Sequence, residues 1–118
     1  MKVFIVDDNA EIRHLVHSII GDLTEQIFEY DSAENIVAMY ELHKPDWIFM
    51  DIKMKPLNGI TATALLKHKF PEARVVILTN YGEQTYRIAA KKAGVSGFFL
   101  KDDLRQIRTI FSDILEPM

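Results

Sequence analysis

The chain has 118 residues, of which 48% are hydrophobic and 26% charged, so it has enough apolar content for one domain with a buried core. The net charge of −3 argues against a nucleic-acid binder that works by neutralising phosphates, and the absence of cysteine excludes disulfides, thiolate metal sites and cysteine nucleophiles. No apolar run is long enough to cross a bilayer and the first residues show no signal-peptide pattern, so we expect a cytoplasmic protein without membrane contact.

The first third of the chain predicts a strand, a helix and a second strand. Residues 3–6 form a short β-branched run, and apolar residues at helical spacing follow it. Asp8 and Glu11 resemble a capping box at the start of that helix, and Gly21 marks its end. Residues 26–30 read as a half-polar strand, which suits the edge of a sheet.

The middle of the chain continues the alternation. A helix is expected over residues 33–43, between Ser32 and Pro45, and the apolar run 47–50 predicts the third strand. A loop with Pro56 and Gly59 leads into a helix that stops near Pro71.

The last third predicts two more strands and two more helices. Residues 74–79 form the fourth strand, an alanine-containing helix ends at Gly94, and residues 98–100 form the fifth strand. The final helix is expected to bury a set of apolar side chains at helical spacing: Leu104, Ile107, Ile110, Phe111, Ile114 and Leu115.

Five strands alternating with five helices predict an α/β fold. Apolar strands of this kind are buried on both faces, which indicates a doubly wound parallel sheet in a three-layer, flavodoxin-like sandwich. For a chain of this size we expect the strand order 2-1-3-4-5, counted along the sequence.

Polar residues end or directly follow four of the predicted strands: Asp7 and Asp8, Asp51, Thr79, and Lys101. Because ligands of doubly wound sheets bind beyond the carboxyl ends of the strands, these residues are expected to meet at one edge. Three carboxylates there would repel one another unless a cation lay among them, and Mg²⁺ prefers oxygen ligands of this kind.

Each of these residues also has an ordinary structural explanation. Asp8 can be explained as a helix cap alone and Asp51 as a turn residue. Thr79 can be a β-branched residue at a strand end, and Lys101 can be half of a surface ion pair. A shared position at one sheet edge favours a functional explanation for the whole set.

The same residues carry a resemblance to the receiver domain of two-component response regulators, over essentially the whole chain. The matching motifs are VDD (Asp7, Asp8), WIFMDIKM (Asp51), VVILTN (Thr79) and GFFLKD (Lys101). The resemblance therefore implies that residues 1–118 form a receiver domain, with no effector domain in the sequence.

The resemblance also implies a role for each residue. Asp51 would accept a phosphoryl group from a histidine kinase or histidine phosphotransfer protein, and Lys101 would pair with a phosphoryl oxygen. Thr79 and Phe98 would be the switch residues. Asp7, Asp8, Asp51 and the backbone carbonyl of Lys53 would hold Mg²⁺. The domain would catalyse only its own phosphorylation and dephosphorylation.

Several positions depart from the commonest pattern of the family. Phe98 stands where a tyrosine is more usual, and Lys55 stands where a proline is usual, with Pro56 one place later. Lys53 and Tyr81 occupy the two positions that tune access of water to the phosphoryl group in this family. We expect them to change the lifetime of the phosphate.

Three other functions are compatible with parts of this sequence. A degenerate receiver that is never phosphorylated would act only as an interaction module. A haloacid-dehalogenase-like phosphatase needs a second carboxylate where Lys53 stands, and a mononucleotide binder would have to place phosphate beside Asp7 and Asp8. By resemblance, the partners would be a histidine kinase or phosphotransfer protein and a downstream effector domain or protein, for which a DNA-binding domain outside this chain is one candidate. A second copy on activation is a further candidate partner, and no direct nucleic-acid binding is expected.

Overall fold

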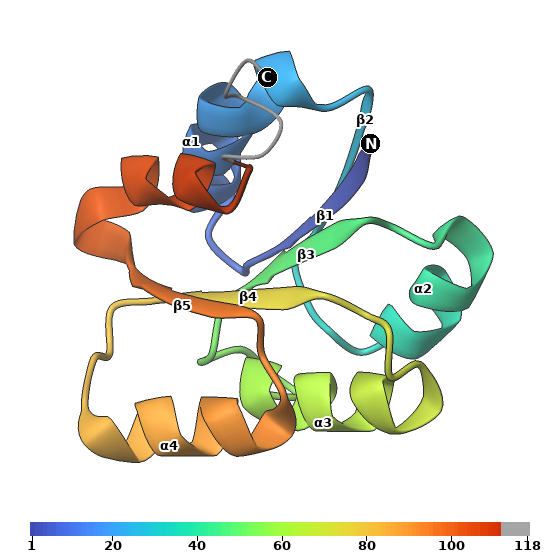
Figure 1. Cartoon of the computed structure of the whole chain (residues 1–118), viewed down its shortest axis with the longest axis vertical. Coiled ribbons are helices and arrows are strands. Elements are labelled where there is room, and N and C mark those ends of the chain that lie inside the picture. The colour runs from blue at the N-terminus through green and yellow to red at the C-terminus, as the bar shows by residue number, and fades with distance from the viewer. Residues whose placement is uncertain (112–118) are drawn as a thin grey trace.

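The computed structural model describes residues 1–111, and its five strands form one parallel sheet in the order β2-β1-β3-β4-β5 (Figure 1). The strands are β1 Lys2–Val6, β2 Gln26–Tyr30, β3 Trp47–Met50, β4 Val75–Thr79 and β5 Gly97–Leu100. The predicted fold class and strand order are confirmed, and the predicted strand bounds agree to within one residue at each end.

Helices cover both faces of this sheet (Figure 1). They are α1 Ala10–Ile20, α2 Ile36–His43, α3 Gly59–Lys69 and α4 Gln84–Ala93, with 3₁₀ segments η1 Gly21–Leu23 and η2 Lys101–Phe111. α1 and η2 pack on one face, and α2, α3 and α4 pack on the other. No helix within residues 1–111 is both long and apolar enough to span a membrane.

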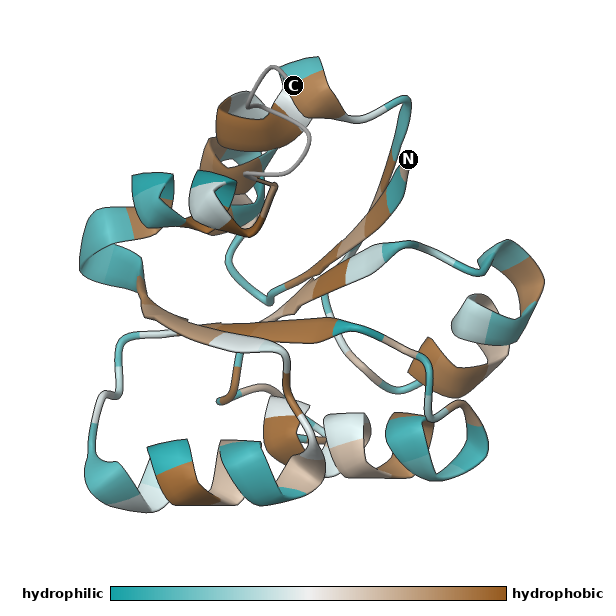
Figure 2. Ribbon diagram, viewed as in Figure 1, coloured by the Kyte–Doolittle hydropathy of each residue, from teal (hydrophilic) through white to brown (hydrophobic). Residues whose placement is uncertain are grey.

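The strands supply two separate cores because successive side chains point to opposite faces. In β1, Val3 and Ile5 join the core beneath α1 and η2, whereas Phe4 and Val6 join the core beneath α2, α3 and α4. All four are buried, and Figure 2 shows mostly hydrophobic central strands between helices in which hydrophobic and hydrophilic residues alternate. This two-sided burial holds the strand ends, and the polar residues that follow them, in fixed positions.

The start of α1 differs from the prediction. Its N-cap is Asn9, whose side-chain oxygen accepts hydrogen bonds from the backbone N–H groups of Glu11 and Ile12 at 2.9 and 3.4 Å. The capping box with Asp8 is therefore wrong, because Asn9 stands one residue closer to the first turn and already satisfies its free N–H groups. The Asp8 carboxylate is left exposed at the sheet edge.

The next helix also starts later than predicted. α2 begins at Ile36 instead of residue 33, since residues 34 and 35 form a turn before it. It ends at His43, because the next residue, Lys44, has a φ of 48° in the left-handed region and stops the helix before Pro45. The end of α4 at Gly94, with a φ of 92°, is as predicted.

The last segment has the predicted buried face but a different helix type. η2 is a 3₁₀ helix with a break at Asp103, and it buries Leu104, Ile107 and Phe111, with Ile110 partly buried. A spacing of three residues also fits the three residues per turn of a 3₁₀ helix, so the apolar pattern did not distinguish the two types. The predicted core positions Ile114 and Leu115 lie outside the described residues.

Candidate functional site

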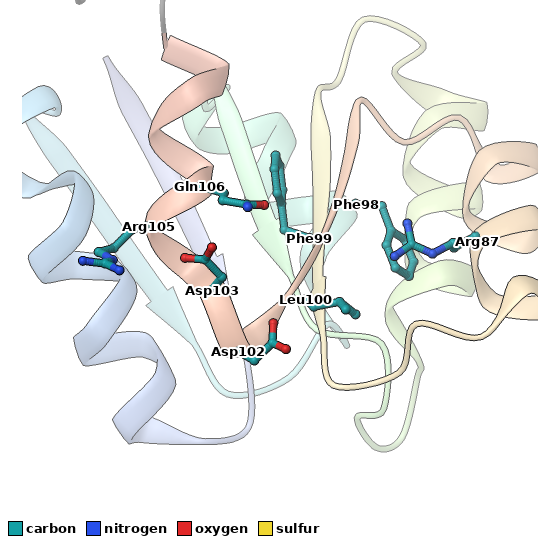
Figure 3. A pocket seen from close by; sticks show the side chains of 8 residues that line it. All are labelled: Arg87, Phe98, Phe99, Leu100, Asp102, Asp103, Arg105 and Gln106. Atoms are coloured by element: carbon teal, nitrogen blue, oxygen red, sulfur yellow. The ribbon is translucent and has the colours of Figure 1, made fainter.

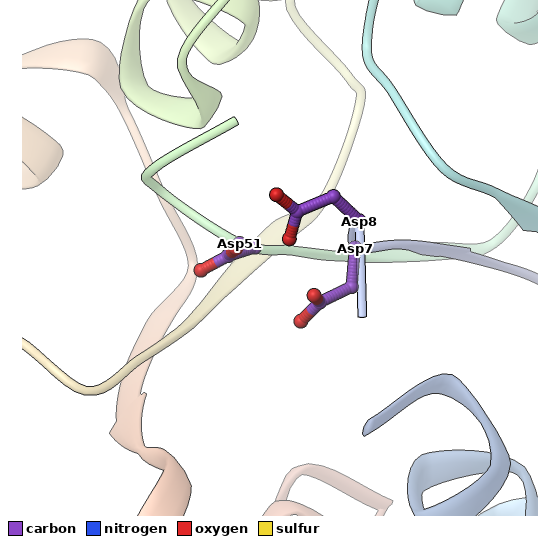
Figure 4. Close-up of side chains that lie close together, drawn as sticks. All are labelled: Asp7, Asp8 and Asp51. Carbon is purple, nitrogen blue, oxygen red and sulfur yellow. The ribbon is translucent and has the colours of Figure 1, made fainter. Parts of the chain in front are cut away.

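Three carboxylates meet at the carboxyl ends of the two central strands (Figure 4). Val6 of β1 pairs with Met50 of β3, so Asp7, Asp8 and Asp51 leave neighbouring strands at the same level. One carboxylate oxygen from each lies within 4.8 Å of the others. Asp7 and Asp51 are buried and Asp8 is exposed, so the cluster lies partly in the protein and partly at its surface.

Lys101 joins the two buried carboxylates. Its Nζ lies 2.8 Å from Oδ2 of Asp7 and 3.1 Å from Oδ1 of Asp51, and its side chain is 8% exposed. Lys101 is the first residue after β5, two strands away from β3 in the sheet, so its long side chain must reach along the sheet edge. The predicted convergence of these three residues is therefore present in the fold.

Burial and charge shift the proton affinities of this cluster. Burial raises the pKa of the Asp51 carboxyl, and the neighbouring Asp7 charge raises it further, against the opposite effect of Lys101. For Lys101, burial acts to lower the pKa, but hydrogen bonding to Asp7 and the negative charges of both carboxylates outweigh burial and raise it. The ammonium group therefore stays protonated and compensates part of the negative charge.

Asp51 is held by its own loop as well as by Lys101. Its Oδ1 accepts a hydrogen bond from the backbone N–H of Ile52 at 2.9 Å, and its own N–H donates to the carbonyl of Val6 at 2.9 Å. The start of α3 packs directly on this turn: a Cβ on Gly59 would lie 1.9 Å from the carbonyl oxygen of Asp51. The sequence marked Gly59 only as a loop residue, whereas the fold requires glycine there for this close approach.

Thr79 ends β4 beside this cluster. Met50 pairs with Ile77, so the register places Thr79 at the same sheet edge as Asp51. Thr79 is fully buried, and its hydroxyl oxygen accepts a hydrogen bond from the backbone N–H of Tyr81 at 3.0 Å. The hydroxyl predicted to respond to a phosphoryl group is therefore bonded to the β4–α4 loop.

Lys53 and Tyr81, the two predicted tuning residues, contact each other. Nζ of Lys53 lies 4.0 Å from the Tyr81 ring centre and 5.7 Å from that of Tyr86, and the two rings are 5.8 Å apart. The Tyr86 side chain, followed by that of Tyr81, raises the pKa of Lys53. Tyr86 could not be recognised from the sequence, because one aromatic residue in an amphipathic helix is interpreted as part of the core.

Phe98, the predicted switch residue, lies on β5 against α4. It is half-buried, and the Arg87 guanidinium carbon lies 4.7 Å from its ring centre. Figure 3 shows both side chains in a groove between α4, β5 and η2, which Leu100 and Asp102 also line. The acidic cluster is not part of this groove.

The acidic cluster has the donors that a magnesium ion requires. Mg²⁺ binds oxygen ligands, using one or two carboxylates and keeping several waters. A groove of about 440 Å³ lies beside the cluster and is lined by Asp8, Lys53, Lys55 and Asn58, so waters and phosphoryl oxygens have room there. Within residues 1–111 the carbonyl of Lys53 accepts no hydrogen bond and remains available as a ligand. Asp7, Asp8 and Asp51 thus form an acidic pocket that could bind Mg²⁺.

The sequence matches the family model described as the response regulator receiver domain over residues 3–112. The chain belongs to this family. Phosphorylation on aspartate in two-component signalling is a property of the family, and the acidic cluster of this receiver domain is consistent with Mg²⁺ binding.

Individual relatives agree with this assignment. The receiver domain is 30% identical to the chemotaxis protein CheY of Halobacterium salinarum, over 97% of this chain and 96% of that protein. It is 32% identical to the transcriptional regulatory protein DegU of Brevibacillus brevis over 86% of this chain, and the match spans only 44% of DegU. A LuxR-family two-component response regulator from Aurantimonas sp. SI85-9A1 has a similar structure, with a TM-score of 0.85, 25% identity, and coverage of 97% of this chain and 84% of that one.

Proposed function

We propose that this receiver domain accepts a phosphoryl group on Asp51 from a histidine kinase or a histidine phosphotransfer protein. The observation that carries the proposal is the buried cluster in which Lys101 contacts both Asp7 and Asp51. Two buried carboxylates repel each other, which destabilises the folded state. Such an unfavourable arrangement is typical of a functional site, where the charges take part in binding or catalysis. A degenerate, purely interacting receiver would have no need for this cluster.

The hydrogen bonds of Asp51 support Oδ2 as the nucleophilic atom. Oδ1 of Asp51 already accepts from the Ile52 N–H and from Lys101, whereas Oδ2 makes no hydrogen bond within residues 1–111. Oδ2 would attack phosphorus and form the new O–P bond, while the P–N bond of a phosphohistidine breaks and the imidazole leaves with a proton. Lys101 would then pair with a phosphoryl oxygen.

The acidic residues would hold Mg²⁺ next to this reaction. Asp7, Asp8 and Asp51 would bind it directly or through water, and the carbonyl of Lys53 would add a further ligand. The bound ion would supply positive charge for the phosphoryl oxygens during in-line transfer. Apart from this self-phosphorylation and the later hydrolysis, we propose no enzymatic activity.

The switch would start at Thr79. Its hydroxyl would exchange the Tyr81 N–H for a phosphoryl oxygen, which releases the β4–α4 loop from its present hydrogen bond. Phe98 would change its contact with Arg87 and so alter the groove of Figure 3. Lys53 and Tyr81, which stack beside the site, would set how fast water reaches the phosphoryl group.

The output would be an effector domain or a separate effector protein, in the cytoplasm, with a second copy of the chain as a further partner on activation. DegU is a transcriptional regulator more than twice as long as the matched region, and CheY is nearly the same length as this chain, so the family provides both arrangements. A DNA-binding effector outside this sequence would follow the first pattern.

The test is the intact-protein mass after incubation with a small acyl phosphate, with and without Mg²⁺. We expect a phosphoryl adduct that requires Mg²⁺ and is absent from the matched variant Asp51→Asn. Labelling of that variant to the wild-type level would contradict the assignment of Asp51. Absence of both the adduct and Mg²⁺ binding in the wild type would instead indicate the degenerate interaction module.

A further inference from the structure

We propose that Arg13 is a positioning residue for the magnesium site, acting through the backbone of Asp7 on the orientation of Asp8. The inference rests on the proposed function, since it concerns how the chain prepares the acidic cluster for Mg²⁺. Arg13 is one turn into α1 and its side chain is 18% exposed.

The contacts of Arg13 connect three parts of the fold. Its Nη1 donates to the carbonyl oxygen of Asp7 at 2.6 Å, and its Nε donates to Oε1 of Glu29 on β2 at 3.1 Å. A guanidinium group is planar and rigid, so its two donors hold a carbonyl and a carboxylate at a fixed mutual position. Glu29 is a β2 residue that pairs with Ile5 in the sheet, which anchors the arrangement to the sheet.

Asp7 is thereby fixed at every polar atom. Its N–H donates to the carbonyl of Tyr30 at 3.0 Å, and its carboxylate accepts from the Asn9 N–H at 2.9 Å and from Lys101 at 2.8 Å. Arg13 fixes the remaining atom, the carbonyl oxygen.

Asp8 is in the opposite situation. Within residues 1–111 its carboxylate accepts no hydrogen bond and forms no ion pair, and Figure 4 shows it on the other side of the β1 end from the Asp7 carboxylate. The peptide that joins Asp7 to Asp8 includes the carbonyl held by Arg13, and the direction of this peptide determines where the Asp8 side chain begins. Arg13 therefore preorganises the one exposed carboxylate of the cluster through its backbone.

A competing role for Arg13 makes the opposite prediction. A cation close to the acidic cluster repels a second cation, so a purely electrostatic Arg13 would weaken Mg²⁺ binding, and its removal would strengthen it. Loss of the positioning role weakens Mg²⁺ binding. Arg13→Lys keeps the charge but loses the planar fork, so it separates the two effects.

The experiment compares Arg13→Met and Arg13→Lys with the wild type. The Mg²⁺ dissociation constant is measured by titration of the amide NMR signals of Asp8 and Asn9, together with the acyl phosphate reaction at half-saturating and saturating Mg²⁺. We expect the dissociation constant to rise about fivefold in Arg13→Met and by a smaller factor in Arg13→Lys, with rates at saturating Mg²⁺ close to that of the wild type. Glu29→Gln, which loosens Arg13 without removing it, should shift binding in the same direction.

The matched control is Arg108→Met. Arg108 also donates to a backbone carbonyl, that of Ile19 at 2.7 Å, and to a carboxylate, that of Asp22 at 2.8 Å, but these contacts are outside the site. Its removal should affect thermal stability and leave the Mg²⁺ dissociation constant unchanged, which separates positioning from a general loss of stability.

The outcomes distinguish this inference from the proposed function. If the wild type binds Mg²⁺ and forms the adduct but Arg13→Met binds the ion equally well or more tightly, the inference is wrong and the proposed function stands. A wild-type Mg²⁺ affinity in Arg13→Lys would also overturn the inference, because the planar guanidinium group would then not be needed for Mg²⁺ binding. If the wild type neither binds Mg²⁺ nor forms the adduct, both fail together.

Discussion

The two sides of the acidic site are built differently. On the inner side, Asp7, Asp51 and Lys101 are buried and hold one another at distances of 2.8 and 3.1 Å. On the outer side, Lys53 is exposed and rests on the half-buried rings of Tyr81 and Tyr86. Buried charges depend strongly on their partners, whereas exposed contacts contribute little to folding. The inner side should therefore affect both stability and chemistry, and the outer side should affect reaction rate with almost no effect on stability.

The largest expected effect is on the inner side, in Lys101→Met. Its loss leaves two buried carboxylates without their shared cation, and removing one partner of a buried ion pair costs about 3 kcal/mol or more. We expect the free energy of unfolding in urea at pH 7 to fall by about this amount. The matched outer-side variant Lys53→Met should change it by less than about 0.5 kcal/mol. Equal effects of the two variants would contradict the division into two sides.

In contrast to Lys101→Met, the variant Asp51→Asn is expected to be more stable than the wild type. Burial and the charge of Asp7 make the ionised Asp51 unfavourable, so its neutral replacement should raise the free energy of unfolding at pH 7 by about 1 kcal/mol. A decrease in stability would show that the attraction of Lys101 outweighs the repulsion of Asp7.

The pH dependence of that difference follows from the raised pKa of Asp51. The folded state keeps the proton to a higher pH than the unfolded state, whose pKa is near 3.8. Stability from this group is fully present below that value and is lost as the pH rises through the folded pKa. The stability that Asp51→Asn gains over the wild type should therefore be small in acid. It should grow as the pH rises from about 3.8 through the folded pKa of Asp51, as measured by urea unfolding at several pH values. A difference that stays constant with pH would contradict the raised pKa.

On the outer side, we expect Tyr81→Ala to shorten the lifetime of the phosphorylated form. The ring that supports Lys53 beside Asp51 is removed, so water has more direct access to the phosphoryl group. The lifetime of the phosphorylated form should fall about threefold, which corresponds to less than about 1 kcal/mol in activation free energy. It is measured by the decay of the phosphoryl adduct in the intact-protein mass after removal of the acyl phosphate. Tyr86→Phe, which retains the ring, is the control and should decay like the wild type. An unchanged or longer lifetime of the phosphate in Tyr81→Ala would contradict this role.

The same contrast explains what the sequence could predict. The buried strands are apolar runs that end at charged or hydroxyl-bearing residues, so the sheet, its order and the convergence of Asp7, Asp51 and Lys101 could be predicted from spacing and topology. Contacts that depend on side-chain direction could not. Arg13 reads as a solvent-facing residue of α1, and nothing in the sequence shows that its guanidinium turns back to the carbonyl of Asp7. The cap at Asn9 was missed because Asp8 is an equally good cap by residue type.

The smallest expected effect is at an ion pair far from the site, and it provides a reference for the buried cluster. Arg108 bonds to Asp22 at 2.8 Å, and this hydrogen bond lowers the pKa of the Asp22 carboxyl, which is solvent-exposed. The resulting stability is present above the ordinary pKa of 3.8 and is lost as the pH falls through the lower folded pKa, which is the reverse of the dependence for Asp51. Asp22→Asn should therefore be slightly less stable than the wild type at pH 7, and the difference should disappear in acid. Because water screens an exposed pair, we expect this loss to be well below that of Lys101→Met in the same urea series. A loss of stability in Asp22→Asn as large as that in Lys101→Met would contradict the idea that burial makes the ion pairs of Lys101 more important for stability than the exposed pair of Arg108 and Asp22.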